Sequence, residues 1–303
     1  VVLENKDSSK AYDIQFLPES GHWVSNVQSV VGIKITNDNG TAAANVVGII
    51  RNERGEEIVR FKTNRFGFAK AVMTPSKKER YWASVSNPTG KEWKVPLPAI
   101  DSLGLVLSTR NIADDRILVL VGTNAETKRA IGQKPYSILI HRDGLLKSLD
   151  VVFKENQLYA SHILDKRELH TGMNILTLID NRGVPLAERL FFNDKGMESI
   201  TLATNVQKVD NDSIQVSLAG FKKRTTSYAS ISVLPADTKA YNFNSNMLSS
   251  FLLKPYVRGF VEEADQYFAD FSKRSMENLD MLLLTQGWSR YEWDHIFDAS
   301  PEK

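Results

Sequence analysis

The histidines are the side chains in this sequence best suited to proton transfer, and one of them lies in a kinase-like tetrapeptide. His141-Arg142-Asp143-Gly144 matches the first three letters of the kinase catalytic loop. A kinase also needs an Asn further along that loop, a Gly-rich phosphate loop and a metal-binding Asp-Phe-Gly, and the sequence has none of these. Apolar runs flank the tetrapeptide on both sides, so we expect a hairpin turn at this place.

Metal binding requires several donor side chains at suitable spacing. The sequence has five histidines, which are His22, His141, His162, His170 and His295. No two of them stand four residues apart, as a helical zinc pair requires. His162 and His170 enclose acidic residues, and we favour ordinary surface histidines over a metal site there. Asp210-Asn211-Asp212-Ser213 resembles the start of a calcium loop, but Ile214 occupies the third ligand position, so we expect a polar turn.

The absence of cysteine narrows the chemistry further. Without a Cys the chain has no disulfide, no thiolate nucleophile, no Cys-ligated zinc and no iron–sulfur cluster. The sequence also lacks a Gly-x-Ser-x-Gly elbow, a Walker loop and a dinucleotide-binding fingerprint. We therefore expect a protein that is not an enzyme and that holds no cofactor and no metal.

Composition and charge exclude two classes of partner. The 303 residues are 42% hydrophobic and 24% charged, as in soluble globular proteins. The 38 Lys and Arg residues exceed the 36 Asp and Glu residues by two, and the two signs are interleaved, so nucleic acid is not expected as a partner. No apolar run, Met281-Leu282-Leu283-Leu284 included, approaches the length of a membrane span, so we expect that this segment does not cross a membrane.

The elements that carry these side chains are predicted to be strands over about the first 200 residues. Short β-branched runs at 30–35, 46–50 and 58–61 alternate with the turns Asn37-Asp38-Asn39-Gly40 and Asn52-Glu53-Arg54-Gly55. Asn and Gly at such positions tolerate the positive φ that tight hairpins need. The pattern predicts a mainly β chain built of tandem immunoglobulin-like sandwiches.

Two segments suggest an internal repeat. Residues 53–61 align with residues 181–189, because both contain a strand, an Arg-Gly turn and a second strand with an Arg. A duplicated sandwich and the general similarity of hairpins explain this alignment equally well.

Proline and glycine clusters mark two boundaries. Residues 93–98 end a strand with two prolines, and Asn193-Asp194-Lys195-Gly196 follows another strand. These boundaries predict one sandwich over 11–98, a second over 99–195 and a third, with a C-terminal helical segment, over 196–303. Pieces of about 100 residues have the usual size of an immunoglobulin-like sandwich. 

The spacing of apolar residues becomes helical from about Asn246, most clearly from Ser275 to Trp293. We expect Ser275 to cap this helix, and strands over 215–218 and 229–233 to precede it. One apolar stripe is expected along the helix, made of Met281, Leu284, Trp288 and Tyr291. Packing of this stripe on a sandwich is the simplest interpretation. A candidate docking surface for a neighbouring domain or a partner is formed by Trp288, Tyr291 and Trp293.

Three segments together resemble a known group of proteins. The first is residues 16–24, with the motif Phe-Leu-Pro-Glu-Ser-Gly, and it is continued by residues 61–83. The second is residues 169–192, and the third is residues 279–293, which contain Leu-Thr-Gln-Gly-Trp. The first alone resembles a macroglobulin-type domain of the alpha-2-macroglobulin superfamily. In this order, the three resemble the N-terminal macroglobulin-like region of large Bacteroidetes cell-envelope proteins.

In that group, a carboxypeptidase-regulatory-like sandwich and a TonB-dependent receptor plug domain follow this region. The resemblance implies macroglobulin-type β-sandwiches in a non-enzymatic structural or binding module of a larger outer-membrane-associated protein, connected with TonB-dependent transport or envelope assembly. It implies a periplasmic or outer-membrane location, with any signal peptide outside these residues, and an outer-membrane β-barrel or a TonB-system component as partner. Covalent trapping through a Cys-x-x-Gln thioester is excluded by the lack of Cys. Ser20 and His22 flank Gly21 where the group often has a Gly pair, so we expect a turn of different shape.

Two other functions stay open from the sequence. A thioester-less macroglobulin-type module that interacts with proteases would carry an exposed bait loop. A carbohydrate-binding or adhesin module would use Trp23, Trp82 and Trp93 as a stacking platform, although Trp is more often packed in or near a core. A hydrolase ranks last, because no nucleophile beside a base is identifiable.

Overall fold

The computed structural model describes residues 12–86, 91–197, 202–210, 212–220, 231–235, 237–238 and 244–286. By its contacts the chain divides into two compact units, Val1–Lys195 with Asn244–Lys303, and Gly196–Phe243. The described residues are mainly β, with tandem sandwiches and a helical segment near the C-terminus, which confirms the predicted fold class. The division into 11–98, 99–195 and 196–303 stays a prediction, and the contacts of Asn244–Lys303 lie with Val1–Lys195.

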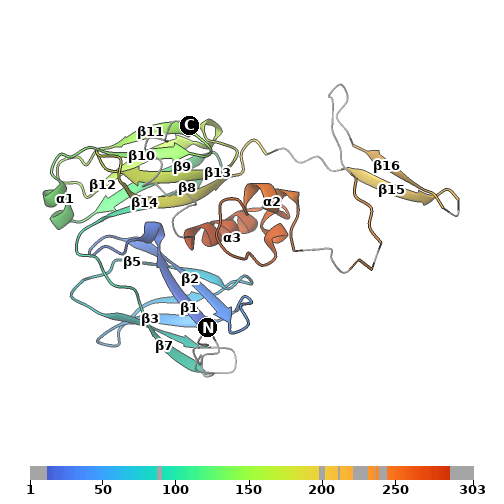
Figure 1. Ribbon diagram of the computed structural model, residues 1–303. Coiled ribbons are helices and arrows are strands. Elements are labelled where there is room, and N and C mark those ends of the chain that lie inside the picture. Colours follow the sequence, from blue (N-terminus) through green and yellow to red (C-terminus); the bar gives the residue numbers. More distant parts are fainter. Residues whose placement is uncertain are drawn as a thin grey trace, which may run out of the picture. The chain divides into compact units, whose positions relative to one another are not determined.

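The first seven strands form two antiparallel sheets that share one core (Figure 1). One sheet has the order β1-β2-β5 and the other has the order β4-β3-β6-β7. The strands are β1 (Tyr12–Pro18), β2 (Ser29–Asn37), β3 (Val47–Asn52), β4 (Glu57–Lys62), β5 (Phe68–Met73), β6 (Tyr81–Ser86) and β7 (Glu92–Pro96). Alternate residues of the central strands point inward, and Val31, Ile33 and Ala83 are fully buried between the sheets.

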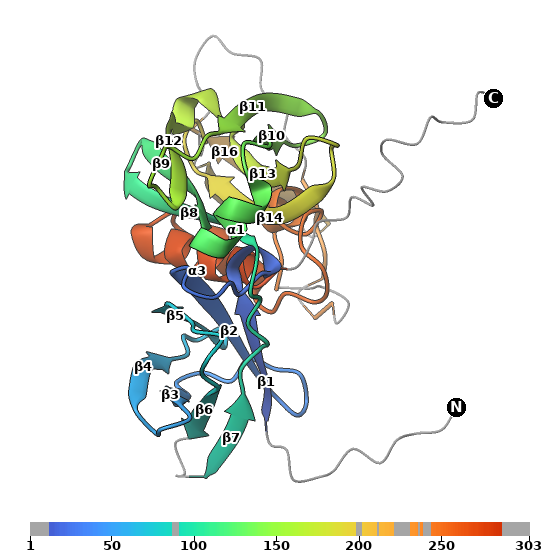
Figure 2. The same cartoon turned by 90° about the vertical axis from the view of Figure 1, so that its left-hand side faces the viewer.

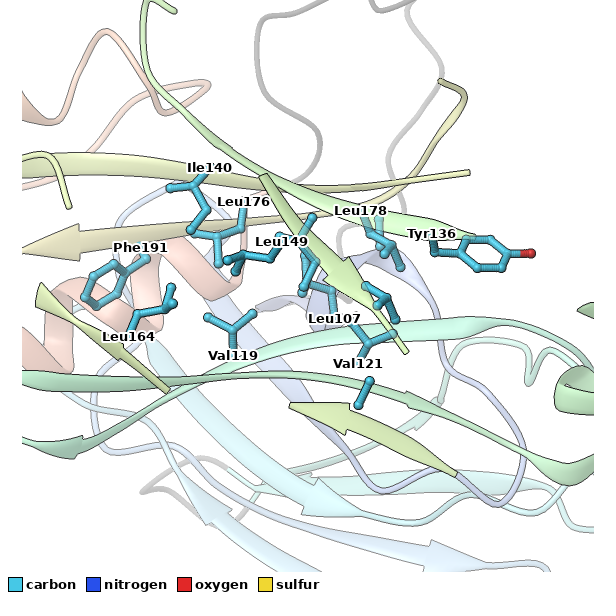
Figure 3. Packing of buried hydrophobic residues seen from close by; sticks show 14 of the residues in the cluster. Leu107, Val119, Val121, Tyr136, Ile140, Leu149, Leu164, Leu176, Leu178 and Phe191 are labelled. Atoms are coloured by element: carbon cyan, nitrogen blue, oxygen red, sulfur yellow. The ribbon is translucent and has the colours of Figure 1, made fainter. Parts of the chain in front are cut away.

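The next seven strands form a second sandwich with the sheets β12-β9-β8 and β11-β10-β13-β14. The strands are β8 (Leu105–Ala113), β9 (Arg116–Thr123), β10 (Tyr136–His141), β11 (Leu145–Val151), β12 (Tyr159–Asp165), β13 (Gly172–Ile179) and β14 (Pro185–Asn193). The helix α1 (Ala125–Ile131) and the short turn η2 (Lys166–Glu168) lie between them along the chain. Figure 3 shows the core, in which Leu107, Val119 and Val121 of one sheet face Leu176 and Leu178 of the other.

The two sandwiches share one topology. Counted from its own first strand, each has a three-stranded sheet 1-2-5 and a four-stranded sheet 4-3-6-7. The aligned segments 53–61 and 181–189 nevertheless lie at different places, because the first spans the β3–β4 turn and the second spans the β13–β14 turn. Counted along the chain, these are the third strand connection of one sandwich and the sixth of the other. The alignment therefore reflects turn chemistry, and the duplication is visible only in the strand order.

The two aligned turns use the same local hydrogen bonds. The Asn52 side chain accepts from the backbone N–H groups two and four residues later, at 3.1 and 3.0 Å, and Asp180 does the same at 2.8 and 2.9 Å. Gly55 and Gly183 follow three residues after these side chains, with φ of 80° and 82°. An Asx side chain that fixes the turn and a Gly that accepts positive φ explain why both hairpins form.

The helical segment comprises α2 (Met247–Leu252), the turn η3 (Ala264–Phe268) and α3 (Lys273–Leu284). The expected cap was wrong, because Ser272 precedes α3 and its side chain accepts from the N–H of Ser275 at 3.2 Å. Of the expected stripe, Leu284 is buried, Met281 is half-buried, and Trp288 and Tyr291 lie outside the described residues. The buried residues of α3 are Leu279, Leu282, Leu283 and Leu284. The candidate docking residues Trp288, Tyr291 and Trp293 lie outside the described residues.

Helix α3 packs between the two sandwiches, and both views show it there (Figures 1 and 2). It lies on the outer face of the sheet β1-β2-β5, where Gly32 permits a close approach. A Cβ on Gly32 would lie 3.0 Å from Thr285 Cγ2 and 3.3 Å from Leu284 Cγ. On its other side α3 contacts β14. Contacts on two sides explain why its buried face is wider than a single stripe.

The unit Gly196–Phe243 contains one described hairpin, β15 (Ala203–Lys208) with β16 (Ile214–Ala219). The expected strand over 215–218 lies within β16, and Asp210 accepts from the N–H of Asp212 at 2.9 Å in the expected polar turn. The expected strand over 229–233 was wrong for its described part, because residues 231–235 are irregular and pair with no strand among the described residues. Within the described residues no helix is long and apolar enough to span a membrane.

Candidate functional site

The chain leaves β1 through the short turn η1 (Glu19–Gly21), which belongs to the first resemblance segment. Ser20 has a φ of 58°, in the left-handed region that favours glycine, and Gly21 has a φ of 87°. The Ser20 hydroxyl makes a contact that glycine lacks, since its Oγ accepts a hydrogen bond from the N–H of Leu107 at 3.1 Å. The turn therefore reaches from the first sandwich into the second.

Turn η1 covers part of the free edge of β8. Strand β8 pairs only with β9, so every second N–H group of β8 points away from its sheet. The N–H of Leu107 donates to Ser20 Oγ, and the N–H of Thr109 donates to Glu19 Oε1 at 3.4 Å. An uncovered sheet edge invites pairing with other chains. Glu19 and Ser20 protect this edge and attach the two sandwiches to each other.

Arg189 on β14 is the centre of a buried ion-pair network, which we call the Arg189 network. Its Nε donates to Glu19 Oε1 at 2.9 Å, and its Nη2 donates to Asp280 Oδ1 at 2.7 Å. The side chains of Arg189 and Glu19 are 3% and 2% exposed, and that of Asp280 is 34% exposed. One guanidinium thus joins the first sandwich, the second sandwich and α3.

The electrostatics of the Arg189 network make its three members interdependent. Burial raises the pKa of the Glu19 carboxyl, and Arg189 acts in the opposite direction. Burial alone would lower the pKa of Arg189, but the carboxylates of Asp280 and Glu19 outweigh it and raise that pKa. The second oxygen of Glu19, Oε2, is buried and has no hydrogen-bond partner in the described part of the chain. Removing one member would leave a buried charge without its counter-ion.

Aromatic contacts of the helical segment reinforce the same junction. Tyr267 in η3 stacks on Phe66 of the first sandwich, with ring centroids 4.5 Å apart. The next residue, Phe268, packs edge-on against Phe192 of β14 at 5.4 Å. Adjacent residues of one turn therefore hold opposite sides of the junction, and such aromatic pairs each contribute about 0.5–1.5 kcal/mol beyond the area they bury.

Polar contacts between loops of the two sandwiches add to the junction. The Asn124 side-chain amide donates to the carbonyls of Ser25 and Ser102 at 2.9 and 2.8 Å. His22 Nε2 lies 3.0 Å from the carbonyl of Leu186 in β14. These bonds join loops of both sandwiches, so the junction is held at several separate points.

The three resemblance segments meet at the Arg189 network. Glu19 comes from residues 16–24, Arg189 from residues 169–192 and Asp280 from residues 279–293. Sequence reasoning missed these residues as a site, although it singled out all three segments. Each segment contains a charged residue of the network, but the separations of 170 and 91 residues conceal the contacts.

A groove of about 780 Å³ opens beside the Arg189 network. It is bordered by β5, by the C-terminal half of β8, by the end of β14 and by the first turns of α3. Glu19, Arg189 and Asp280 line it together with further charged side chains. This groove, which lies next to the junction, is the candidate binding site.

The histidines do not form a reactive site in the described part of the chain. His141 Nε2 lies 2.9 Å from the Thr177 hydroxyl, which in turn lies 3.5 Å from Glu188 Oε2. Thr177 is fully buried, so a substrate does not reach this row of side chains. Burial lowers the pKa of His141 to about 4. His162 is hydrogen-bonded to the carbonyl of Asp150 at 2.8 Å.

No metal centre is visible among the described residues, where no three His, Cys, Asp or Glu side chains gather as a metal ion requires. Asp165 and Glu168, which lie between His162 and His170, bond instead to Arg167 and Lys147. His295 lies outside the described residues.

The three tryptophans considered for a carbohydrate-stacking platform lie in different surroundings. Trp23 is 1% exposed and packs in the first core against Tyr81. Trp82 carries the Lys94 ammonium 4.0 Å above its ring, and the ring centroid of Trp93 lies 4.8 Å from that of Tyr12. Their faces are therefore already in contact with other side chains of this chain.

Comparison with known proteins finds little. No protein-family model and no curated protein matches this chain. Among solved structures, the alpha-2-macroglobulin of E. coli in its native conformation is 9% identical, with a TM-score of 0.25, over 70% of this chain and 18% of that chain. The BSP domain of a biofilm associated protein is 11% identical, with a TM-score of 0.29, over 62% of this chain and 30% of that chain. The chain thus spans less than a third of either, and the function is argued from the junction itself.

Proposed function

We propose that this region is a non-enzymatic structural and binding module of a larger outer-membrane-associated protein, connected with TonB-dependent transport or envelope assembly. The observation that carries the proposal is the convergence of the three resemblance segments on the Arg189 network. These segments are far apart in the sequence, and together they hold the two sandwiches and α3 in contact. That role suits a spacer that presents binding surfaces.

The chemistry of the junction supports holding in preference to reaction. Its charged groups are paired with one another, and the hydroxyl that His141 contacts, that of Thr177, is buried. The groove beside the junction offers charged and apolar side chains for recognition. A module of this kind binds through its loops, sheet edges and groove.

The proposal includes a periplasmic or outer-membrane-associated location and a protein partner in the cell envelope, either an outer-membrane β-barrel or a TonB-system component. Its support is the resemblance of residues 16–24, 169–192 and 279–293. The candidate docking residues Trp288, Tyr291 and Trp293 follow directly after α3 in the chain and stay part of the proposal.

Purification of the tagged full-length protein from detergent-solubilised outer membranes, followed by mass spectrometry, tests this proposal. We expect stoichiometric recovery of a β-barrel or TonB-system component. The variant Arg189→Met should lose that partner, while Arg54→Met, at an exposed ion pair far from the junction, should keep it. Recovery only from the soluble fraction, with a protease attached, would overturn the proposal and favour the protease-interacting module.

A further inference from the structure

The groove beside the Arg189 network contains a buried ammonium group, that of Lys166, near the carboxylates of Asp194 and Asp114. Lys166 is 6% exposed and lines the groove. Its Nζ lies 3.7 Å from Asp194 Oδ1, beyond the usual length of a charge-assisted hydrogen bond, and 5.8 Å from the centre of the Phe191 ring. An ammonium has three N–H donors. Lys166 therefore has donor capacity that Asp194 does not use.

The rim of the groove is positively charged. Lys70, Arg110, Lys195 and Lys273 line it and make no ion pair within the described part of the chain. Only Asp114 and Glu277 among the lining acids are likewise outside the ion pairs described above. Over all the charged side chains that line the groove, six cations stand against five acids, so the positive excess is one, and the four cations outside the ion pairs attract negative charge locally.

Strand β8 supplies backbone groups to the same groove. The outward-facing N–H groups of Leu107 and Thr109 are covered by η1. The period of two along a strand places the N–H and carbonyl of Asn111 in the same row, and Asn111 lines the groove. No described residue bonds to these backbone groups of Asn111 outside the sheet. The free edge of β8 thus continues into the groove as far as Asn111, after which the register with β9 shifts.

Apolar side chains complete the surface. Val72 of β5 and Ile112 of β8 line the groove and are 47% and 46% exposed. Phe271, at the entrance to α3, also lines it and has a φ of 48°, a conformation that bulky residues rarely adopt. Backbone held in such a conformation is found most often at binding sites.

We propose that this groove binds an extended acidic peptide segment of a partner protein, which adds a strand to β8 at Asn111 and places a carboxylate on the Lys166 ammonium. The free strand edge selects an extended peptide chain, since main-chain hydrogen bonds give affinity in strand addition and neighbouring side-chain sites give specificity. The cationic rim selects acidic residues, and Val72 and Ile112 accept apolar residues between them. The inference rests on the proposed function, because it names the partner chemistry of that binding module.

The test is fluorescence anisotropy of the whole chain with a labelled ten-residue peptide of alternating Glu and Val. A Lys-Val peptide of the same length is the charge control, and a Glu-Pro peptide is the strand control because proline cannot donate to a ladder. We expect binding of the Glu-Val peptide alone, weakened by salt. Lys166→Met should weaken it by about tenfold or more, as loss of a charge-assisted hydrogen bond does.

Two variants keep the test independent of folding. Lys273→Glu changes an exposed rim residue and should also weaken binding, whereas Lys62→Met, on β4 outside the groove, should leave it unchanged. Equal binding of the Lys-Val or Glu-Pro peptide overturns the inference, and so does unchanged binding by the folded Lys166→Met chain. Binding of a sulfated oligosaccharide without binding of the Glu-Val peptide overturns the ligand class.

The peptide-binding test and the purification test can fail independently of each other. A chain that co-purifies with its envelope partner but binds no acidic peptide overturns the groove inference alone. A chain that binds the Glu-Val peptide but is recovered only from the soluble fraction overturns the envelope role alone.

Discussion

At the residue scale the decisive feature is a guanidinium shared by two carboxylates. Arg189 is 3% exposed, and its partners come from parts of the chain 170 and 91 residues away. A complete buried ion pair contributes modestly to the free energy of folding. Removal of one partner leaves the other charge buried and unpaired, which is strongly destabilising. The Arg189 network therefore stabilises the fold only when all three segments are in position.

We predict that Arg189→Met lowers the free energy of unfolding by about 3–5 kcal/mol, because it leaves Glu19 buried without its counter-ion. Urea titration followed by circular dichroism measures this loss. The control Arg54→Met removes an exposed pair with Glu79 and should change stability by about 0.5 kcal/mol or less. Adding Glu19→Gln to Arg189→Met should restore part of the loss. A loss no larger than that of the control would contradict the role given to Arg189.

His141 gives a prediction in pH. Its pKa is about 4 in the folded protein, because burial disfavours the charged ring, against an unfolded value of 6.5. Between these values the unfolded chain binds a proton that the folded chain does not, so stability rises with pH through this window and is lost as pH falls through it. Unfolding in urea at pH 7, 5.5 and 4.5 measures the slope.

The variant His141→Gln should flatten that part of the slope, because a neutral amide next to Thr177 and Glu188 takes up no proton. Val47→Thr, at an exposed position without a titratable group, serves as control and should keep the slope of the unmodified chain. Parallel slopes for the chain and its His141→Gln variant would show that His141 does not protonate on unfolding.

At the scale of elements, α3 joins the two sandwiches by packing against both of them. It lies on the outer face of β1-β2-β5 and contacts β14, and η3 beside it contacts Phe66 and Phe192 with adjacent residues. The absence of a side chain at Gly32 sets how closely α3 approaches the first sandwich. The position of α3 thus depends on a residue of β2 as much as on its own leucines.

We predict that Gly32→Val costs about 1–3 kcal/mol, as overpacking of a close contact does. Its Cβ alone would lie 3.0 Å from Thr285 Cγ2 and 3.3 Å from the carbonyl of Leu17. Hydrogen exchange should quicken in α3 more than in β9 and β10 of the second sandwich. Val47→Thr, at an exposed position on the opposite sheet, should leave exchange in α3 unchanged. Unaltered exchange in α3 of the Gly32→Val chain would refute the contact.

Most secondary-structure elements could be predicted from the sequence, but the contacts between distant elements could not. Asn-Gly and Asp-Gly turns with alternating apolar residues made the strands predictable, because these signals are local. The start of α3 was misplaced because Ser272 and Ser275 both suit a cap, and the choice depends on the hydrogen bond between them. The Arg189 network was not predictable, because nothing local indicates that Glu19 and Arg189 pair across 170 residues.

At the scale of the whole molecule, the central claim is that both sandwiches and the helical segment open as one cooperative body held at the Arg189 network. Repeated sandwiches joined by short linkers often unfold separately, since inter-domain contacts within a chain are usually modest. Here η1 covers the β8 edge, α3 packs against β14, and Arg189 bonds to both neighbours. Unfolding of one sandwich or of α3 would therefore break contacts that stabilise the other two.

Native-state hydrogen exchange in low urea, read out by mass spectrometry, tests this claim most directly. We predict that the slowest amides of β2, β13 and α3 share one free energy of opening in the unmodified chain, and that in Arg189→Met those of β2 and α3 separate from those of β13. Different opening free energies in the unmodified chain, or one shared value that persists in Arg189→Met, would contradict the account.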